Sequence, residues 1–212
     1  PALGVNAISE ALKKMDQATI DSIPLLRFFS ETIGEGTTGK GLIKDLTTDI
    51  SGYLTANAGV LTIDSQRSQM LLDIRYPVTS SSDSLLSEIR AKAESYGIHC
   101  DIYSHQPPLF KDLNDPLITT LVSVYETYLS SVTFDETVTE EEKKEYIRTP
   151  AKPLAIGGGT YARSMPGLVA FGPAFPWEKD QAHQVDESMS EDTIYLLVRI
   201  YEDAIRALAG IL

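Results

Sequence analysis

The sequence has almost no cysteine and no long apolar run, and each absence excludes a class of protein. Cys100 is the single cysteine among 212 residues, so the chain cannot form an internal disulfide and is not a disulfide-stabilised secreted fold. No apolar segment reaches membrane length, and no signal-like hydrophobic segment is present. We therefore expect a cytoplasmic protein without a membrane partner.

Basic residues are also scarce. Lys and Arg number 18 against 30 Asp and Glu, which gives a formal net charge of −12. Such a chain repels phosphate backbones and anionic lipid, which argues against nucleic acid as a partner. An initiator methionine is missing too, and the opening "PALGVNAISEALKKM" leads at once into a helical pattern. From this opening we expect a fragment or a processed chain.

The first half of the chain has the pattern of a small α+β layer. Apolar residues at helical spacing behind Asn6, a candidate N-cap, predict an amphipathic first helix. Two β-rich runs, "SGYLTANAGVLTID" and "SQMLLDIRYPV", predict adjacent antiparallel strands. A helix over 83–96 with Gly97 at its stop then precedes a predicted strand in "IHCDIYSHQPP". This order is most of a βαββαβ, ferredoxin-like unit, and Pro107 and Pro108 mark the expected domain boundary.

The second half predicts helices around a glycine-rich loop. Asp115 before Pro116 indicates a helix start, and the charged stretch 133–152 indicates a solvated loop with at most one short helix. The run "LAIGGGTYARSMPGLVAFGPAFP" predicts short strands that enter a binding loop, and a last helix is expected from Ser190 to Ala209. Its buried face is expected to carry Ile194, Leu197, Tyr201, Ile205 and Leu208.

Two stretches contain candidate anion-binding residues. Gly157, Gly158 and Gly159 let backbone N–H groups approach a carboxylate without a Cβ in the way, and Arg163 adds a fork-shaped donor. A tight turn and a surface ion pair explain these residues as well. In "LLDIRYPV", Arg75 falls on the strand face opposite the apolar residues and projects away from the core. A charge pair with the aspartate two residues earlier is the simpler alternative.

The histidines offer metal-ligand chemistry, but their spacing does not decide it. His183 in "DQAHQVDES" has acids nearby, although no HExxH, CxxC or HxH motif accompanies it, so a ligand and a surface histidine both fit. In "IHCDIYSH", one strand face would carry His99, Asp101, Tyr103 and His105. That set is either ligand-like or the solvated face of an edge strand.

Taken together, "LLDIRYPV", "PLAIGGGTYARSMPGLVAFGP" and "AHQVDES" resemble the zinc dipeptidases of the peptidase V kind. These belong to the larger family that includes aminoacylase, carboxypeptidase G and succinyl-diaminopimelate desuccinylase. The resemblance implies an α/β catalytic domain that binds two zinc ions, with a βαββαβ lid domain inserted into it. Residues 1–108 would be the later part of the lid, and residues 109–212 the C-terminal part of the catalytic domain.

The resemblance also implies roles for particular residues. Arg75 would hold the C-terminal carboxylate of a dipeptide substrate, the segment from Gly157 to Thr160 would line that substrate, and Arg163 is the arginine of the same loop. His183 would be the last zinc ligand. The other ligands and the catalytic glutamate would lie upstream of this chain, so the fragment alone would be inactive. The competing hypothesis is a non-enzymatic α+β module that forms a homodimer or binds a small carboxylate.

Overall fold

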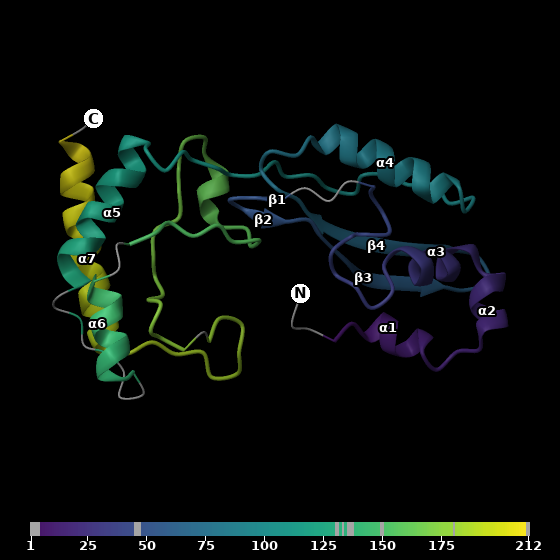
Figure 1. Ribbon diagram of the computed structural model, residues 1–212, viewed down its shortest axis with the longest axis horizontal. Helices are drawn as coiled ribbons and strands as arrows, with labels where there is room; N and C mark the ends of the chain where they lie inside the picture. Colours follow the sequence, from purple (N-terminus) through teal and green to yellow (C-terminus); the bar gives the residue numbers. More distant parts are fainter. Residues whose placement is uncertain are drawn as a thin grey trace. The chain divides into compact units, whose positions relative to one another are not determined.

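The computed structural model describes residues 5–44, 48–129, 132, 134, 138–148, 151–179 and 181–210 (Figure 1). The chain divides into two compact units. The first comprises Pro1–Leu109 together with Ala155–Gly157, and the second comprises Phe110–Leu154 together with Gly158–Leu212. The chain therefore passes from one unit to the other directly after the Pro107–Pro108 pair, and a short later segment returns to the first unit.

Short helices open the first unit. Their bounds are α1 (Ala7–Leu12), α2 (Gln17–Ser22) and α3 (Pro24–Thr32). The Asn6 side chain accepts hydrogen bonds from the backbone N–H groups of Ile8 and Ser9, so the expected N-cap is confirmed. The apolar spacing of the expected helix also included Val5, but Val5 precedes α1, is 81% exposed and contributes nothing to the core. Neither α2 nor α3 was expected from the sequence, although α3 buries Phe28 and Phe29.

The strands of the first unit form antiparallel pairs. Their bounds are β1 (Thr48–Asp49), β2 (Gly52–Tyr53), β3 (Thr55–Ile63) and β4 (Ser68–Arg75). β3 pairs with β4 as the expected hairpin, and the register sets Thr55 opposite Arg75. On β4, Met70, Leu72 and Ile74 pack against the core, whereas Asp73 between them is exposed. The predicted alternation of apolar and polar faces is therefore confirmed.

The helix after this hairpin, α4 (Ser82–Glu94), is confirmed together with its stop signal. Gly97 has a φ of +72°, a conformation that favours glycine. Its N–H donates to the carbonyl of Glu94, and the N–H of Ile98 donates to the carbonyl of Ala93. These two bonds satisfy carbonyls at the helix end that would otherwise lack partners.

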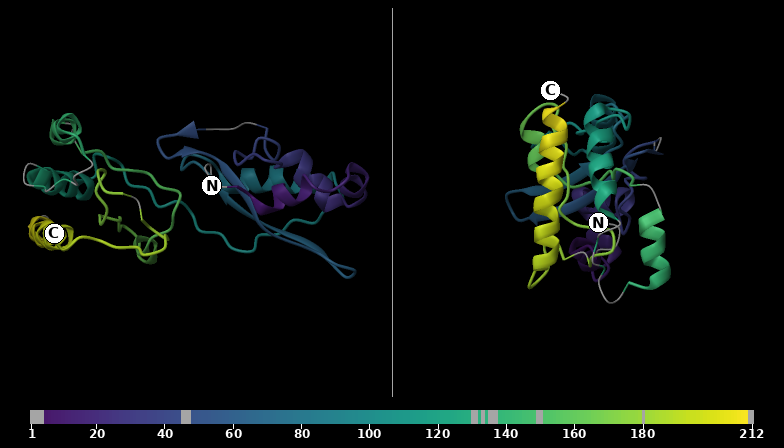
Figure 2. Two further views of the ribbon diagram at one scale, coloured as in Figure 1. Left: turned by 90° about the horizontal axis from the view of Figure 1, so that it is seen from below. Right: turned by 90° about the vertical axis from the view of Figure 1, so that its left-hand side faces the viewer.

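The core of the first unit lies on one face of the β3–β4 hairpin. Phe28 from α3 and Ile89 and Ala93 from α4 meet Ala56 of β3 there, and a second cluster joins α1, α2 and α3 to the neighbouring Ala58. The helices therefore cover the same side of the sheet (Figure 2). The other face carries the polar residues of β4, which leaves Arg75 outside the core.

The strand expected in "IHCDIYSHQPP" is not formed, and that prediction is wrong. Residues 98–110 lack strand pairing, so the longer described sheet consists of β3 and β4 alone. The carbonyl of Cys100 instead accepts a hydrogen bond from Arg90 Nε, and Ile102 and Tyr103 are 51% and 88% exposed. Strand propensity depends on a pleated and half-buried surface, which these apolar residues do not have here. The ferredoxin-like assignment stays a prediction.

Asp49 ties the β1–β2 turn to the loop after β4 and gives stability at neutral pH. Its carboxylate accepts from the hydroxyl and N–H of Ser51 and from the hydroxyl and N–H of Thr79, at 2.6 to 2.9 Å. These bonds, led by that of the Ser51 hydroxyl, lower the pKa of Asp49 from 3.8 to about 2.

We predict that Asp49→Asn weakens the acid sensitivity of the protein. A folded-state pKa below the unfolded one gives stability that is present above the unfolded pKa of 3.8 and is lost as the pH falls toward 2. The parent should therefore lose more melting temperature than the variant between pH 6 and pH 3, as measured by circular dichroism. Identical pH dependence in both proteins would contradict the role of Asp49.

The second unit is built on two helices that run side by side. Its helical bounds are α5 (Pro116–Leu129), α6 (Glu140–Arg148), the 3₁₀ turn η1 (Tyr161–Ser164) and α7 (Glu191–Ala209). Figure 2 shows α5 and α7 packed along each other, and buried Tyr128 and Leu197 belong to their shared core. Phe175 and Trp177 fold onto this core with stacked rings 5.0 Å apart. The predicted starts of α5 and α7 are confirmed, and α6 is the short helix of the charged stretch.

The Tyr128 hydroxyl links the two helices by donating to the carboxylate of Asp203. This hydrogen bond raises the pKa of Tyr128, because the carboxylate favours the protonated phenol.

Within the described residues, no helix is long and apolar enough to cross a membrane.

Two expectations for the second unit are wrong. The described residues 151–179 around the glycine run form turns and the η1 helix but no strand. On α7, Ile194 and Ile205 are 47% and 68% exposed, and the buried residues are Leu197, Ile200 and Ala204. The apolar face of α7 is wider than the surface that α5 and the loop with Phe175 and Trp177 cover, so part of this apolar face is exposed.

Candidate functional site

Arg75 lies at the end of β4 on the face of the sheet that the helices leave open. Its side chain is 41% exposed, and that of Asp73, two residues earlier on the same face, is 56% exposed. Arg75 Nη2 donates to Asp73 Oδ2 at 3.1 Å, so the charge pair considered from the sequence is present. The Arg75 side chain is nevertheless partly exposed to solvent, so a ligand can reach it.

The structure brings Arg75 together with Gly157, the first residue of the glycine run. Arg75 Nη1 donates to the carbonyl oxygen of Gly157 at 2.8 Å, across 82 positions of sequence. The short segment Ala155–Gly157 belongs to the first unit, so this contact lies within one unit. Two site residues predicted from separate motifs therefore meet. No sequence signal indicated that the carbonyl, and not an N–H group, would make the contact.

The rest of the glycine loop belongs to the second unit. Gly158, Gly159 and Thr160 are exposed, and the η1 turn that follows is anchored by buried Ala162. The N–H of Arg163 donates to the carbonyl of Thr160 at 3.1 Å, while the Arg163 side chain is at the surface. The residues of the loop are thus exposed to solvent, while the carbonyl of Thr160 is already occupied by the N–H of Arg163.

His183 has an uncommon backbone conformation. Its φ is +63°, and Asp186 three residues later has a φ of +59°. Residues other than glycine seldom adopt such angles, and strained backbone of this kind gathers at functional sites. The N–H of His183 donates to Glu187 Oε2 at 3.2 Å, and the imidazole is exposed. Asp180, one of the nearby acids in the sequence, lies outside the described residues.

The described part of the chain does not fit a complete zinc site. It contains no group of three or more His, Cys, Asp or Glu residues that could hold a metal ion. His99 Nε2 lies 2.9 Å from Asp101 Oδ2, but His105 Nε2 lies 2.8 Å from the Tyr76 hydroxyl instead. The ligand-like set expected on one strand face is therefore not assembled, because that strand is not formed.

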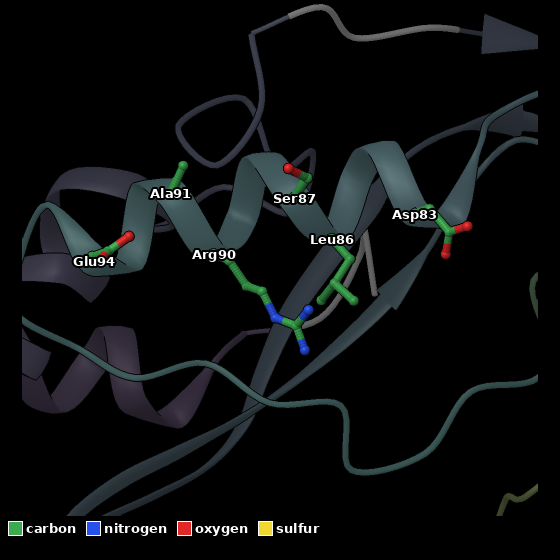
Figure 3. A pocket seen from close by; sticks show the side chains of 6 residues that line it. All are labelled: Asp83, Leu86, Ser87, Arg90, Ala91 and Glu94. Carbon is green, nitrogen blue, oxygen red and sulfur yellow. The ribbon is translucent and has the colours of Figure 1, made fainter.

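Two surface hollows of the described residues are lined by side chains other than the predicted site residues. A hollow of about 490 Å³ in the first unit follows the outer side of α4, and all of its lining side chains come from this one helix (Figure 3). They are Asp83, Leu86, Ser87, Arg90, Ala91 and Glu94. A second hollow of about 230 Å³ lies beside α5, where Glu126 accepts a hydrogen bond from the N–H of Ala151. The first hollow has charged side chains along one helix face, but neither hollow contains Arg75, Gly157, Arg163 or His183.

Comparison with known proteins gives relatives but no matching family profile. The chain is 28% identical over 211 residues to proteins of Staphylococcus aureus strains USA300, COL and N315 that carry the name "putative dipeptidase". The match covers 98% of this chain but 41% of the length of each relative. The likeness along nearly the whole chain supports a dipeptidase-like family.

Proposed function

We propose that this chain is a fragment of a zinc-dependent dipeptidase of the peptidase V kind, which hydrolyses dipeptides with a free C-terminal carboxylate. Residues 1–108 are the later part of a ferredoxin-like lid, and residues 109–212 are the C-terminal part of the α/β catalytic domain. The relatives with dipeptidase names support the activity class, and the sequence motifs support the finer assignment.

The observation that carries the proposal is the contact between Arg75 and the glycine segment. A partly exposed arginine side chain on the open face of a sheet is a suitable receptor for a carboxylate, because the guanidinium donors match the two carboxylate oxygens. Gly157 lies in the same unit as Arg75 and is itself exposed. A glycine can lie beside an extended peptide without side-chain hindrance.

His183 is the proposed zinc ligand of this chain, and its strained loop is consistent with that role. Zinc polarises a carbonyl and activates water in hydrolases of this class. Because the described residues provide no further ligand set, the remaining ligands would come from the longer sequence of the relatives, of which the match covers 41%. The isolated chain is accordingly proposed to be inactive.

Zinc titration of this chain is expected to show weak binding. A complete zinc-finger site gives about 10–16 kcal/mol for four ligands, so one imidazole should give a Kd of roughly 1 mM or weaker. Calorimetry with the parent, His183→Ala and the control His99→Ala measures this. A tight one-to-one isotherm that disappears only in His183→Ala would show that the chain holds a complete site.

A second candidate is a non-enzymatic α+β module that forms a homodimer or binds a small carboxylate. The observation in its favour is the β3–β4 hairpin, in which each strand has an edge without a described partner strand. Sequence upstream of Pro1 discriminates the two. A histidine, an aspartate and paired glutamates at metal-ligand spacing favour the enzyme, and a methionine directly before Pro1 favours the module.

A further inference from the structure

We propose that Asp73 and Gly157 are positioning residues that hold the guanidinium of Arg75 in one orientation for a carboxylate ligand. The inference deepens the proposed function and rests on it in one respect, namely that Arg75 receives the carboxylate. It assigns Asp73 a role that the proposed function does not include, and it gives the carbonyl group of Gly157 a second role besides lining the substrate.

The two contacts restrain different nitrogens of the same planar group. Asp73 Oδ2 accepts from Nη2 at 3.1 Å, and the carbonyl oxygen of Gly157 accepts from Nη1 at 2.8 Å. With the side-chain stem of Arg75 fixed on β4, two further points of attachment define the plane of the guanidinium. The Nε–H group and the second hydrogen of each Nη are the donors that remain for a ligand.

A side chain on Gly157 would crowd this arrangement. A Cβ built on Gly157 would lie 3.2 Å from Arg75 Cδ and 3.2 Å from Arg75 Nη1, so the arginine would have to shift. A Cβ on Gly159, two residues later in the run, would meet nothing within 4 Å. A side chain would therefore meet Arg75 at Gly157 but would meet nothing at Gly159, so Gly159 provides a matched control.

The contribution of Asp73 is orientation and not attraction. Its negative charge offsets the charge of Arg75 and so weakens the long-range pull on an anion. An arginine that is already ordered, however, loses less side-chain entropy when a ligand binds. A neutral but oriented pair favours a ligand with the right fork geometry over any anion.

The test measures the order of the Arg75 side chain by ¹⁵N NMR relaxation of Nε–H in the whole chain. We expect an order parameter of about 0.8 in the parent and below about 0.6 in Asp73→Ala and Gly157→Ala, with Gly159→Ala like the parent. Arg67, which pairs with Asp64 at 3.6 Å in the β3–β4 turn, is an internal reference whose order should not change. Equal Arg75 mobility in the parent and in both variants would overturn the positioning role.

A second measurement separates this inference from the proposed function. L-alanyl-L-alanine and its C-terminal amide are titrated while the Arg75 signal is followed. The acid should perturb Arg75 and the amide should not, although the chain's net charge of −12 favours the more positive amide non-specifically. Affinity for the acid should fall about 3- to 10-fold in Gly157→Ala. If Arg75 is ordered but its signal changes with neither ligand, the carboxylate role is contradicted. If the affinity for the acid is the same in Gly157→Ala as in the parent, the positioning role is contradicted.

Discussion

Replacing Arg75 by alanine in a full-length protein that carries this segment is expected to lower kcat/KM on free dipeptides by about 30- to 1000-fold. A charge-assisted pair in a closed site contributes roughly 2–4 kcal/mol, and each 1.4 kcal/mol is a factor of ten. Arg75→Lys should lose less, because it keeps the charge. It cannot, however, present two nitrogens, as Arg75 does to Asp73 and Gly157. Steady-state kinetics on both variants measures the effect.

The control is a dipeptide amide, which has no carboxylate for Arg75 to bind. The amide should be a poor substrate for the parent and should lose little more in Arg75→Ala, so that enzyme and substrate changes form a double-mutant cycle. Arg75 also contacts Gly157, and the melting temperature of the variant must therefore be recorded. Equal losses on acid and amide would mean that Arg75 is structural. The carboxylate role would then pass to Arg163 or to the glycine backbone.

The parts of the fold that follow from local chemistry could be predicted from the sequence. Asn6 and Gly97 act on groups within a few residues, so a cap and a stop are visible without knowledge of the rest of the chain. The strand around Leu72 could be predicted for the same reason, since an alternation of apolar and polar residues is typical of a strand in a sheet with one buried face. A usable signal was also overlooked. Pro24 begins α3 before an apolar run, by the same rule that found Pro116.

The features that depend on distant partners could not be predicted. The segment around Tyr103 has strand-forming residues but no strand partner, and nothing local decides whether a neighbouring edge exists. The contact between Arg75 and Gly157 joins positions 82 residues apart, and each motif by itself allowed a simpler explanation. The role of His183 as a metal ligand could not be decided from the sequence for the same reason. A metal ligand is recognised by the other ligands around it, and the described residues provide no such set.

The α7 helix shows this limit most clearly, because its sequence contains more apolar residues than its partners cover. The heptad-like pattern predicts that Ile194 and Ile205 are buried, yet Ile205 is 68% exposed. Ile200, which that pattern omitted, is 2% exposed and lies in the core with Trp177. Sequence periodicity identifies the apolar arc of a helix but not which part of the arc a neighbour occupies.

We therefore expect a large difference in stability between Ile200→Ala and Ile205→Ala. Ile200→Ala removes buried methyl groups and leaves a cavity, so the free energy of unfolding of the second unit should fall by about 2–4 kcal/mol. Ile205→Ala changes an exposed side chain and should cost less than about 0.5 kcal/mol. Both variants make the same chemical change on the same helix, so helix propensity is matched.

The measurement is urea unfolding followed by tryptophan fluorescence. Trp177 is the single tryptophan of the chain and packs in the cluster that contains Ile200, so its signal reports the core of the second unit specifically. Ile200→Ala should lower the urea midpoint markedly, while the midpoint of Ile205→Ala should stay close to that of the parent. If Ile205→Ala lowers the urea midpoint as much as Ile200→Ala does, Ile205 contacts a partner surface in solution. The sequence pattern would then have identified the buried face of α7 correctly.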